Sequence, residues 1–165
     1  MRRYVAIVPL LLLSSTAYPQ QSKDASYSCT VEWMGGGSYN SSSKRWEGNG
    51  FKPSSLGEYS KFVLRMQFVE TRPVVTFKKT ENLDDYMVSI TPSGSPFPRD
   101  CDGDSDSRVA TVRLGSFRCS AAAGDYIFNQ NTNRFLQTSA VGYFTGKDNN
   151  DVIPFVAGGT CTKIE

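Results

Sequence analysis

Alternation of apolar and polar residues is the feature that most constrains this chain. In Lys61–Glu70 every second residue is apolar, namely Phe62, Leu64, Met66 and Phe68. A period of two is typical of β-strands with one buried face, and helical spacing is almost absent along the chain. About eight short segments of this kind, separated by turn sequences, predict an all-β protein. We expect a single antiparallel barrel or sandwich and no second domain.

Three details of this pattern can be checked against a structure. In Ser26–Trp33 the alternation predicts that Trp33 shares one face with Tyr27, Cys29 and Val31. The stretch 92–107 contains three prolines and many Gly, Ser and Asp residues, which predicts a long irregular loop. The dipeptide Gly158-Gly159 predicts a break between the last two strands, while Arg108–Leu114 is expected to be a strand throughout.

The N-terminus has the pattern of a secretory signal peptide. Arg2 and Arg3 precede an apolar run that ends at Leu13, and Ser15 and Ala17 form a small-x-small cleavage site. The run is too short to span a bilayer, so we expect no stable membrane insertion. Residues 1–17 are therefore expected to be removed and 18–165 to form the β-domain, with 18–25 as a loose leading segment. The expected location is the periplasm or the cell exterior.

The four cysteines are predicted to form two disulfide bonds. An exported chain meets an oxidising environment, where an even number of cysteines is usually paired. Three pairings are possible, and we favour Cys29–Cys161 with Cys101–Cys119. The first pair would join the first and last strands, which are neighbours if the sheet closes. The second would join the ends of a loop rich in Gly, Pro and Asp.

Composition excludes several functions. The chain has no histidine, which removes Ser-His-Asp hydrolysis and histidine-ligated metal chemistry. Loss of Arg2 and Arg3 would balance the remaining basic residues against the 16 acidic ones. A neutral protein has no general electrostatic attraction to phosphate backbones, so we expect no nucleic-acid partner.

An acidic segment is the strongest candidate for metal binding. Alternating carboxylates on a flexible loop can provide oxygen ligands to calcium. The spacing fails the EF-hand pattern, because that pattern requires glycine at the sixth position and glutamate at the twelfth. A solvated loop without a cofactor is therefore the favoured interpretation, and calcium is the alternative. The four carboxylates concerned are Asp100, Asp102, Asp104 and Asp106.

Two further sets of residues carry alternative functions. A glycoside hydrolase requires only two converging carboxylates, and the candidates are Glu32, Glu47, Glu58, Glu70, Asp84, Asp85 and Asp125. Aromatic residues can form a core, a ligand pocket or a recognition face. The aromatic candidates are Trp33, Tyr39, Trp46, Phe51, Tyr59, Tyr126, Phe128, Phe135, Tyr143 and Phe144.

Several short motifs resemble a set of small exported proteobacterial proteins of unknown function. The resemblance covers most of the chain after residue 17 and implies a bacterial exported protein, with no catalytic residues to transfer. The motifs are Trp46-Glu47-Gly48, Phe51-Lys52-Pro53-Ser54, Lys61-Phe62, Phe117-x-Cys119, Tyr126-Ile127-Phe128-Asn129, Thr132-x-Arg134-Phe135-Leu136, Gly142-Tyr143 and Gly159-Thr160-Cys161-Thr162-Lys163-Ile164.

A second resemblance is to periplasmic lysozyme-inhibitor barrels. Tyr27-Ser28-Cys29 is similar to their Tyr-x-Cys opening, and Cys161 to their terminal cysteine. The favoured function is therefore a non-catalytic binding module of the bacterial envelope, inhibitor-like in character, whose partner is another envelope or secreted protein. A barrel that binds a small ligand and a carboxylate-dependent glycoside hydrolase are the alternatives.

Overall fold

The structure is a computed structural model that describes residues 23–76, 79–103, 108–121 and 124–165. The expected signal peptide and residues 18–22 lie outside the described residues. The rest of the expected loose segment is anchored to the fold. The Lys23 Nζ atom lies 2.9 Å from Asp84 Oδ1, Asp24 Oδ1 accepts a hydrogen bond from the Phe68 amide, and Ala25 begins the first strand. In the part of the chain that is described, no helix is long and apolar enough to cross a membrane.

The protein is all-β, as its alternating pattern predicts. Along the chain, a 3-10 helix lies between the second and third strands, and a single helical turn precedes the last strand. In chain order, the elements are β1 (Ala25–Asn40), β2 (Arg45–Phe51), η1 (Pro53–Ser60), β3 (Lys61–Thr76), β4 (Lys79–Pro92), β5 (Arg99–Cys101), β6 (Ala110–Val112), β7 (Ser116–Ala121), β8 (Gly124–Asn129), β9 (Arg134–Ser139), α1 (Val141–Phe144) and β10 (Phe155–Lys163).

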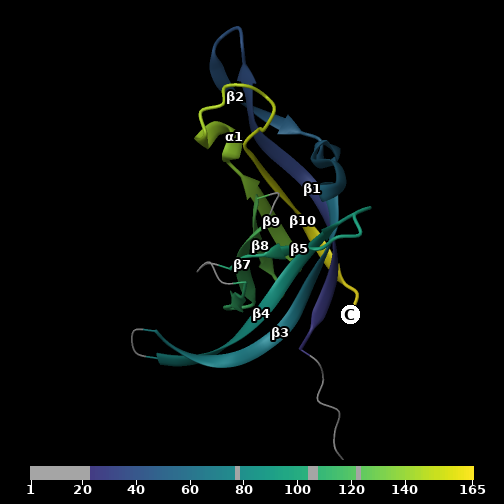
Figure 1. The fold of residues 1–165 in the computed structure, drawn as a ribbon, viewed down its shortest axis with the longest axis vertical. Coiled ribbons are helices and arrows are strands. Elements are labelled where there is room, and N and C mark those ends of the chain that lie inside the picture. The colour runs from purple at the N-terminus through teal and green to yellow at the C-terminus, as the bar shows by residue number, and fades with distance from the viewer. Residues whose placement is uncertain (1–22, 77–78, 104–107, 122–123) are drawn as a thin grey trace, which may run out of the picture.

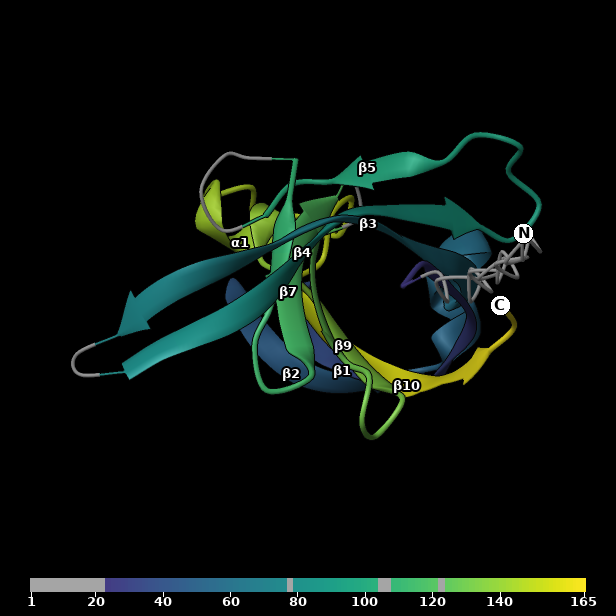
Figure 2. The ribbon, with the colours of Figure 1, turned by 90° about the horizontal axis from the view of Figure 1, so that it is seen from below.

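All ten strands form one antiparallel sheet. Its main path is β5-β4-β3-β1-β10-β9-β8-β7, with β2 paired to β1 and β6 paired to β4. Seen from below, the sheet curls around its own interior (Figure 2). Two long hairpins extend beyond this curled body, one formed by β1 and β2 at the top and the other by β3 and β4 at the lower left (Figure 1). The architecture is thus a barrel-like sheet rather than two separate layers.

The two ends of the sheet meet at a seam between β5 and β7, without a continuous ladder of hydrogen bonds. Asp102 and Ser120 exchange both backbone hydrogen bonds, with N···O distances of 2.8 and 2.7 Å. Next to them, the Cys101–Cys119 disulfide crosses the seam. Part of the expected 92–107 loop therefore forms a strand, because Arg99–Cys101 adds to the edge of β4 opposite Val88–Ile90.

The second disulfide lies at the middle of the sheet. Cys29 of β1 is directly opposite Cys161 of β10, and their Cα atoms are 4.0 Å apart. Both disulfides are the pairs that the sequence favoured. Bonds of this kind persist in oxidising compartments, which agrees with a location outside the cytoplasm.

Aromatic rings fill the interior of the curled sheet. The Tyr27 and Phe128 ring centroids are 4.8 Å apart, and Phe62 lies 5.0 Å from Phe135 and 5.7 Å from Tyr126. Edge contacts of this kind add to the stabilisation that comes from burial alone. The alternation in β3 is confirmed, because Phe62, Leu64 and Met66 are all buried.

Tyr126 is the basis of a prediction about stability at high pH. Burial, and then the neighbouring Tyr59, raise its pKa far above the usual value of 10.0, and the Gln137 amide donates to its hydroxyl over 2.9 Å. Below pH 10 the phenol is neutral in both states. Above pH 10 it ionises only in the unfolded chain, so the free energy of unfolding should fall by up to about 1.4 kcal/mol per pH unit from this group.

Urea unfolding between pH 9 and 11.5 tests this effect. Tyr126→Phe should be less stable at pH 8, since it loses the hydrogen bond from Gln137, but its stability should fall less steeply above pH 10 than that of the wild type. Burial also raises the pKa of Tyr27 and Tyr86, so some slope should remain in the variant. Equal slopes in the two proteins would contradict the assignment to Tyr126.

Candidate functional site

A β-bulge in β1 turns Trp33 out of the barrel. The register with β10 shifts between Val31, which is opposite Gly159, and Trp33, which is opposite Gly158, so Glu32 is the extra residue. Glu32 and Trp33 consequently both lie on the outer face. The prediction that Trp33 shares the inner face with Val31 is therefore wrong. Bulges often occur where a strand must re-aim a side chain.

Trp33 completes an apolar row that crosses four adjacent strands. The row begins with Ile127 on β8, continues through Leu136 on β9 and Gly158 on β10, and ends at Trp33 on β1. Gly158 is required for this arrangement, because a Cβ atom there would lie 2.5 Å from the Trp33 indole ring. The indole therefore covers the bare backbone of β10, and 50% of the Trp33 residue surface stays exposed.

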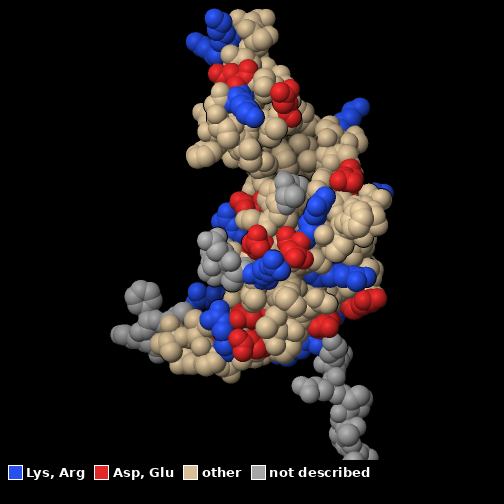
Figure 3. Space-filling view, in the orientation of Figure 1, with Lys and Arg blue, Asp and Glu red and all other residues tan. Residues whose placement is uncertain are grey.

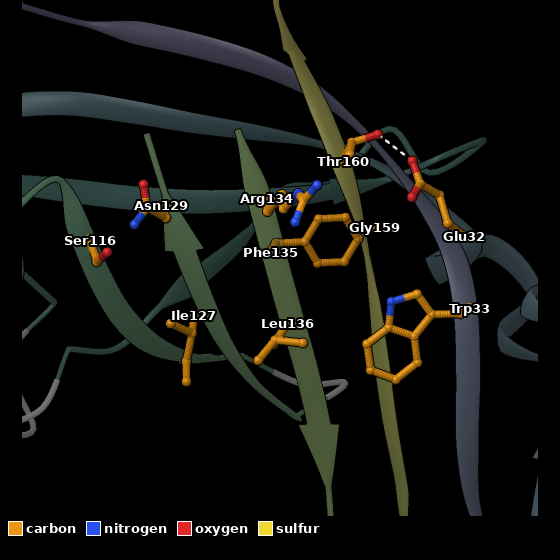
Figure 4. A pocket seen from close by; sticks show the side chains of 10 residues that line it. All are labelled: Glu32, Trp33, Ser116, Ile127, Asn129, Arg134, Phe135, Leu136, Gly159 and Thr160. Atoms are coloured by element: carbon orange, nitrogen blue, oxygen red, sulfur yellow. Dashed lines mark hydrogen bonds between the residues drawn. The ribbon is translucent and has the colours of Figure 1, made fainter. Parts of the chain in front are cut away.

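A polar row borders the apolar one. It contains Ser116, Asn129, Arg134 and Thr160 on four neighbouring strands, and the Thr160 hydroxyl donates to Glu32. Together with Trp33, Ile127 and Leu136, these residues line a shallow hollow of about 590 Å³ (Figure 4). Among the described residues, no carboxylate lies within 4.0 Å of the Arg134 guanidinium. We call Glu32, Trp33, Ile127, Arg134, Leu136 and Thr160 the Trp33 face.

The carboxylates proposed for glycosidase chemistry are spread over different parts of the fold. Asp84 and Asp85 lie in the β3–β4 hairpin, where they pair with Lys23 and Arg72 respectively. Hydrogen bonds from Thr71 and then Lys23 lower the pKa of Asp84, which is opposite to the shift that a general acid needs. Asp125 accepts from Arg118 and Ser120 on the sheet.

Two further candidates have polar partners elsewhere. Glu32 accepts from Thr160 on the outer sheet face, and Glu47 accepts from Asn40 and Ser43 in the β1–β2 hairpin. The contacts of these carboxylates are thus those of structural ion pairs and hydrogen bonds.

The structure describes only half of the acidic segment suggested for calcium. Asp100 and Asp102 project outward on either side of the buried Cys101, and the backbone of Asp102 pairs with Ser120 at the seam. Asp104 and Asp106 lie outside the described residues. Within the described ranges, no group of three or more His, Cys, Asp or Glu side chains is placed to hold a metal ion. Calcium binding by the whole segment stays a prediction.

The aromatic candidates divide into three groups by burial. Tyr126, Phe128 and Phe135 belong to the core, whereas Trp33, Tyr143 and Phe144 are exposed. The other four are partly buried, namely Tyr39, Trp46, Phe51 and Tyr59. Tyr143 packs against Trp46 at the top of the molecule, where the Trp46 indole donates to Asp148 over 3.0 Å. In the Trp33 face, by contrast, the aromatic residue is aligned with the exposed side chains of Leu136 and Ile127 on neighbouring strands.

Charges are mixed on the side of the molecule shown in Figure 3. Basic and acidic side chains are interspersed there, with no large area of one sign. That side therefore offers no extended basic surface for a phosphate backbone.

One sequence signal could have revealed the site. Val31 and Met34 are both apolar but three residues apart, so a strict alternation cannot bury both of them. An inserted residue between them would restore the pattern, and the structure shows that Glu32 has this role. Ile127 and Leu136 carry no signal by themselves, because apolar residues are common on protein surfaces.

No protein-family model, curated protein or solved structure matches the chain.

Proposed function

We propose that this chain is a non-catalytic binding module, exported to the bacterial envelope, that engages another envelope or secreted protein through the Trp33 face. The observation that carries the proposal is the bulge at Glu32, which moves a tryptophan from the core side of β1 to the outer face. Burying Trp33 inside would stabilise the fold, so its exposure favours a role in recognition.

The surroundings of Trp33 fit a protein partner. Ile127 and Leu136 continue the apolar surface across rigid strands, so little side-chain or backbone order must be gained on binding. Arg134 and Glu32 border this surface and can orient the partner through charge-assisted hydrogen bonds. Buried tryptophan and arginine side chains are the most frequent energetic centres of protein interfaces. The partner surface should therefore present apolar side chains together with a carboxylate opposite Arg134.

Two other functions have less support. An interior occupied by the rings of Tyr27, Phe62, Tyr126, Phe128 and Phe135 favours a packed core over a ligand-carrying barrel. The lowered pKa of Asp84 and the cationic and hydroxyl partners of Asp85 and Asp125 do not favour a glycosidase.

Site-specific photo-cross-linking in the cells that make the protein tests the proposal. p-Benzoylphenylalanine at Ile127 should yield one discrete adduct with a protein. The same reagent at Val75, which is 77% exposed on the β3–β4 hairpin, should yield none. Trp33→Ala should reduce the Ile127 adduct by about 30-fold at limiting protein concentration, as expected for loss of about 2 kcal/mol at an interface.

A glycine pair provides the matched control. Gly158→Ala keeps tryptophan at position 33, but the added Cβ displaces its indole ring. This variant should therefore also reduce the adduct. Gly50→Ala adds a Cβ where no atom lies within 4 Å, and should leave the adduct unchanged. Equal adduct yields from Ile127 and Val75, or no adduct from Ile127, would contradict the proposed function.

A further inference from the structure

The turn between β6 and β7 places an apolar side chain in water. Arg113 and Ser116 exchange both backbone hydrogen bonds, with N···O distances of 2.8 and 2.9 Å, so the connection is a two-residue hairpin turn. Its central residues are Leu114, with φ of 52°, and Gly115, with φ of 77°. Positive φ at both positions is the backbone of a type I′ turn, where Asn, Asp and Gly are the usual residues.

Leu114 is unfavourable here in two independent ways. A leucine in the left-handed region brings its Cβ close to the backbone, which asparagine and glycine tolerate far better. The side chain also gains nothing from burial, because 87% of the residue surface is exposed. Backbone strain of this kind concentrates at functional positions. Replacement by asparagine would remove both costs, so the folded state alone gives no reason for leucine.

The neighbouring turn holds Leu114 in a fixed position. The backbone amide of Gln130 donates to the Gly115 carbonyl over 2.8 Å, and the side-chain Nδ2 of Asn131 donates to the Leu114 carbonyl over 3.3 Å. Asn131 is itself held in place, because its backbone amide donates to Asn129 Oδ1 over 2.9 Å. A preorganised projection of this kind loses little conformational freedom when it is bound.

The turn lies at the end of the Trp33 face. Ser116, two residues after Leu114, lines the same hollow and pairs with Asn129, which in turn pairs with Arg134. Two residues of a strand span about 7 Å, so one partner can contact both Leu114 and the polar row. Arg113 also belongs to the turn, and its Nη2 atom lies 3.9 Å from Oε2 of Glu81.

We infer that Leu114 is an anchor residue that inserts into an apolar pocket of the protein bound by the Trp33 face. This inference rests on the proposed function. The Trp33 face is a shallow sheet surface, whereas Leu114 projects from the tip of a tight turn. Only a concave surface can bury such a projection. The partner is therefore expected to be a folded protein with an apolar pocket beside the surface that covers Trp33.

The variant Leu114→Asn tests whether Leu114 serves binding or stabilises the fold. The variant should unfold at a higher temperature than the wild type, because asparagine relieves the left-handed strain. It should also reduce the cross-linked adduct at Ile127 by at least about tenfold, and Leu114→Met should retain the adduct. Val75→Asn, a matched change of an exposed apolar residue, should leave the adduct unchanged. A lower melting temperature or an undiminished adduct for Leu114→Asn would overturn the inference.

Cross-linking from position 114 itself distinguishes the inference from the proposed function. p-Benzoylphenylalanine at Leu114 should yield an adduct of the same mass as the one from Ile127. An adduct from Ile127 alone would overturn the anchor and leave the proposed function standing, whereas no adduct from either position would overturn both. Sedimentation of the purified protein with phosphatidylglycerol vesicles, if abolished in Leu114→Asn, would assign the turn to a membrane surface and also overturn the inference.

Discussion

Replacing both Cys29 and Cys161 with alanine is expected to lower the free energy of unfolding by about 5 kcal/mol. The two residues are 132 positions apart in the sequence. In the chain-entropy account, a cross-link over a loop of that length removes about 5 kcal/mol of conformational freedom from the unfolded chain. The effect approaches the whole stability of many single domains. Urea unfolding of the variant and of the oxidised wild type measures it.

The variant should nevertheless fold to the same sheet at low temperature. Cys29 and Cys161 occupy one position in a ladder that runs from Tyr27–Lys163 to Gly36–Phe155, and the backbone pairing does not depend on the sulfur atoms. Far-ultraviolet circular dichroism should therefore be unchanged below the transition. A loss of less than about 2 kcal/mol would show that residual structure already brings β1 and β10 together in the unfolded chain.

The sequence was sufficient for the fold class and for the disulfide pairing. Phe62, Leu64 and Met66 alternate without interruption, and their inward orientation follows from the pattern alone. The pairing of Cys29 with Cys161 required only that the first and last strands be neighbours, which holds for β1 and β10 in this curled sheet.

The sequence predictions are wrong mainly where a residue is present because of a distant neighbour. The Gly158-Gly159 dipeptide predicted a break, yet β10 is continuous there. Both glycines instead serve close packing: Gly158 accommodates the Trp33 indole, and a Cβ at Gly159 would lie 1.9 Å from the Thr30 carbonyl oxygen. At both positions, glycine is required by the close approach of a residue that is distant in the sequence. A local sequence pattern cannot reveal such a neighbour.

The candidate site was missed for a related reason. The alternation places Trp33 on the inner face only if it continues through Glu32, where the bulge interrupts it. The alternation in Arg108–Leu114 predicts a strand that includes Leu114, but β6 ends at Val112 and Leu114 lies in a type I′ turn, for which Leu-Gly is an unusual sequence. At both places the chain departs from the locally favoured arrangement, and both departures expose a large apolar side chain. Functional positions are where such local rules are expected to fail.

Replacing Cys101 and Cys119 with alanine should have a smaller and more local effect than removing the other disulfide. Their separation of 18 residues corresponds to about 3 kcal/mol in the chain-entropy account. The bond also joins the two ends of the sheet at the seam, where Asp102 and Ser120 form an isolated pair. Among the described residues, the remaining backbone hydrogen bonds at the seam are those of Asp102 with Ser120, and Arg113 pairs with Ser116 at the turn between β6 and β7.

Hydrogen exchange distinguishes local opening from global destabilisation. In the Cys101→Ala, Cys119→Ala variant, the amides of Asp102 and Ser120 should exchange at least about 1,000-fold faster than in the wild type under native conditions, since sub-global openings can expose a seam without unfolding the rest. A global loss of about 3 kcal/mol would by itself accelerate exchange by only about 150-fold. The amides in the ladder between β1 and β10 should change only by the factor that the global loss of stability imposes. Equal acceleration at both places would show that the seam opens only when the whole sheet unfolds. The curled sheet would then be one cooperative unit, in which the Trp33 face cannot move independently of the seam.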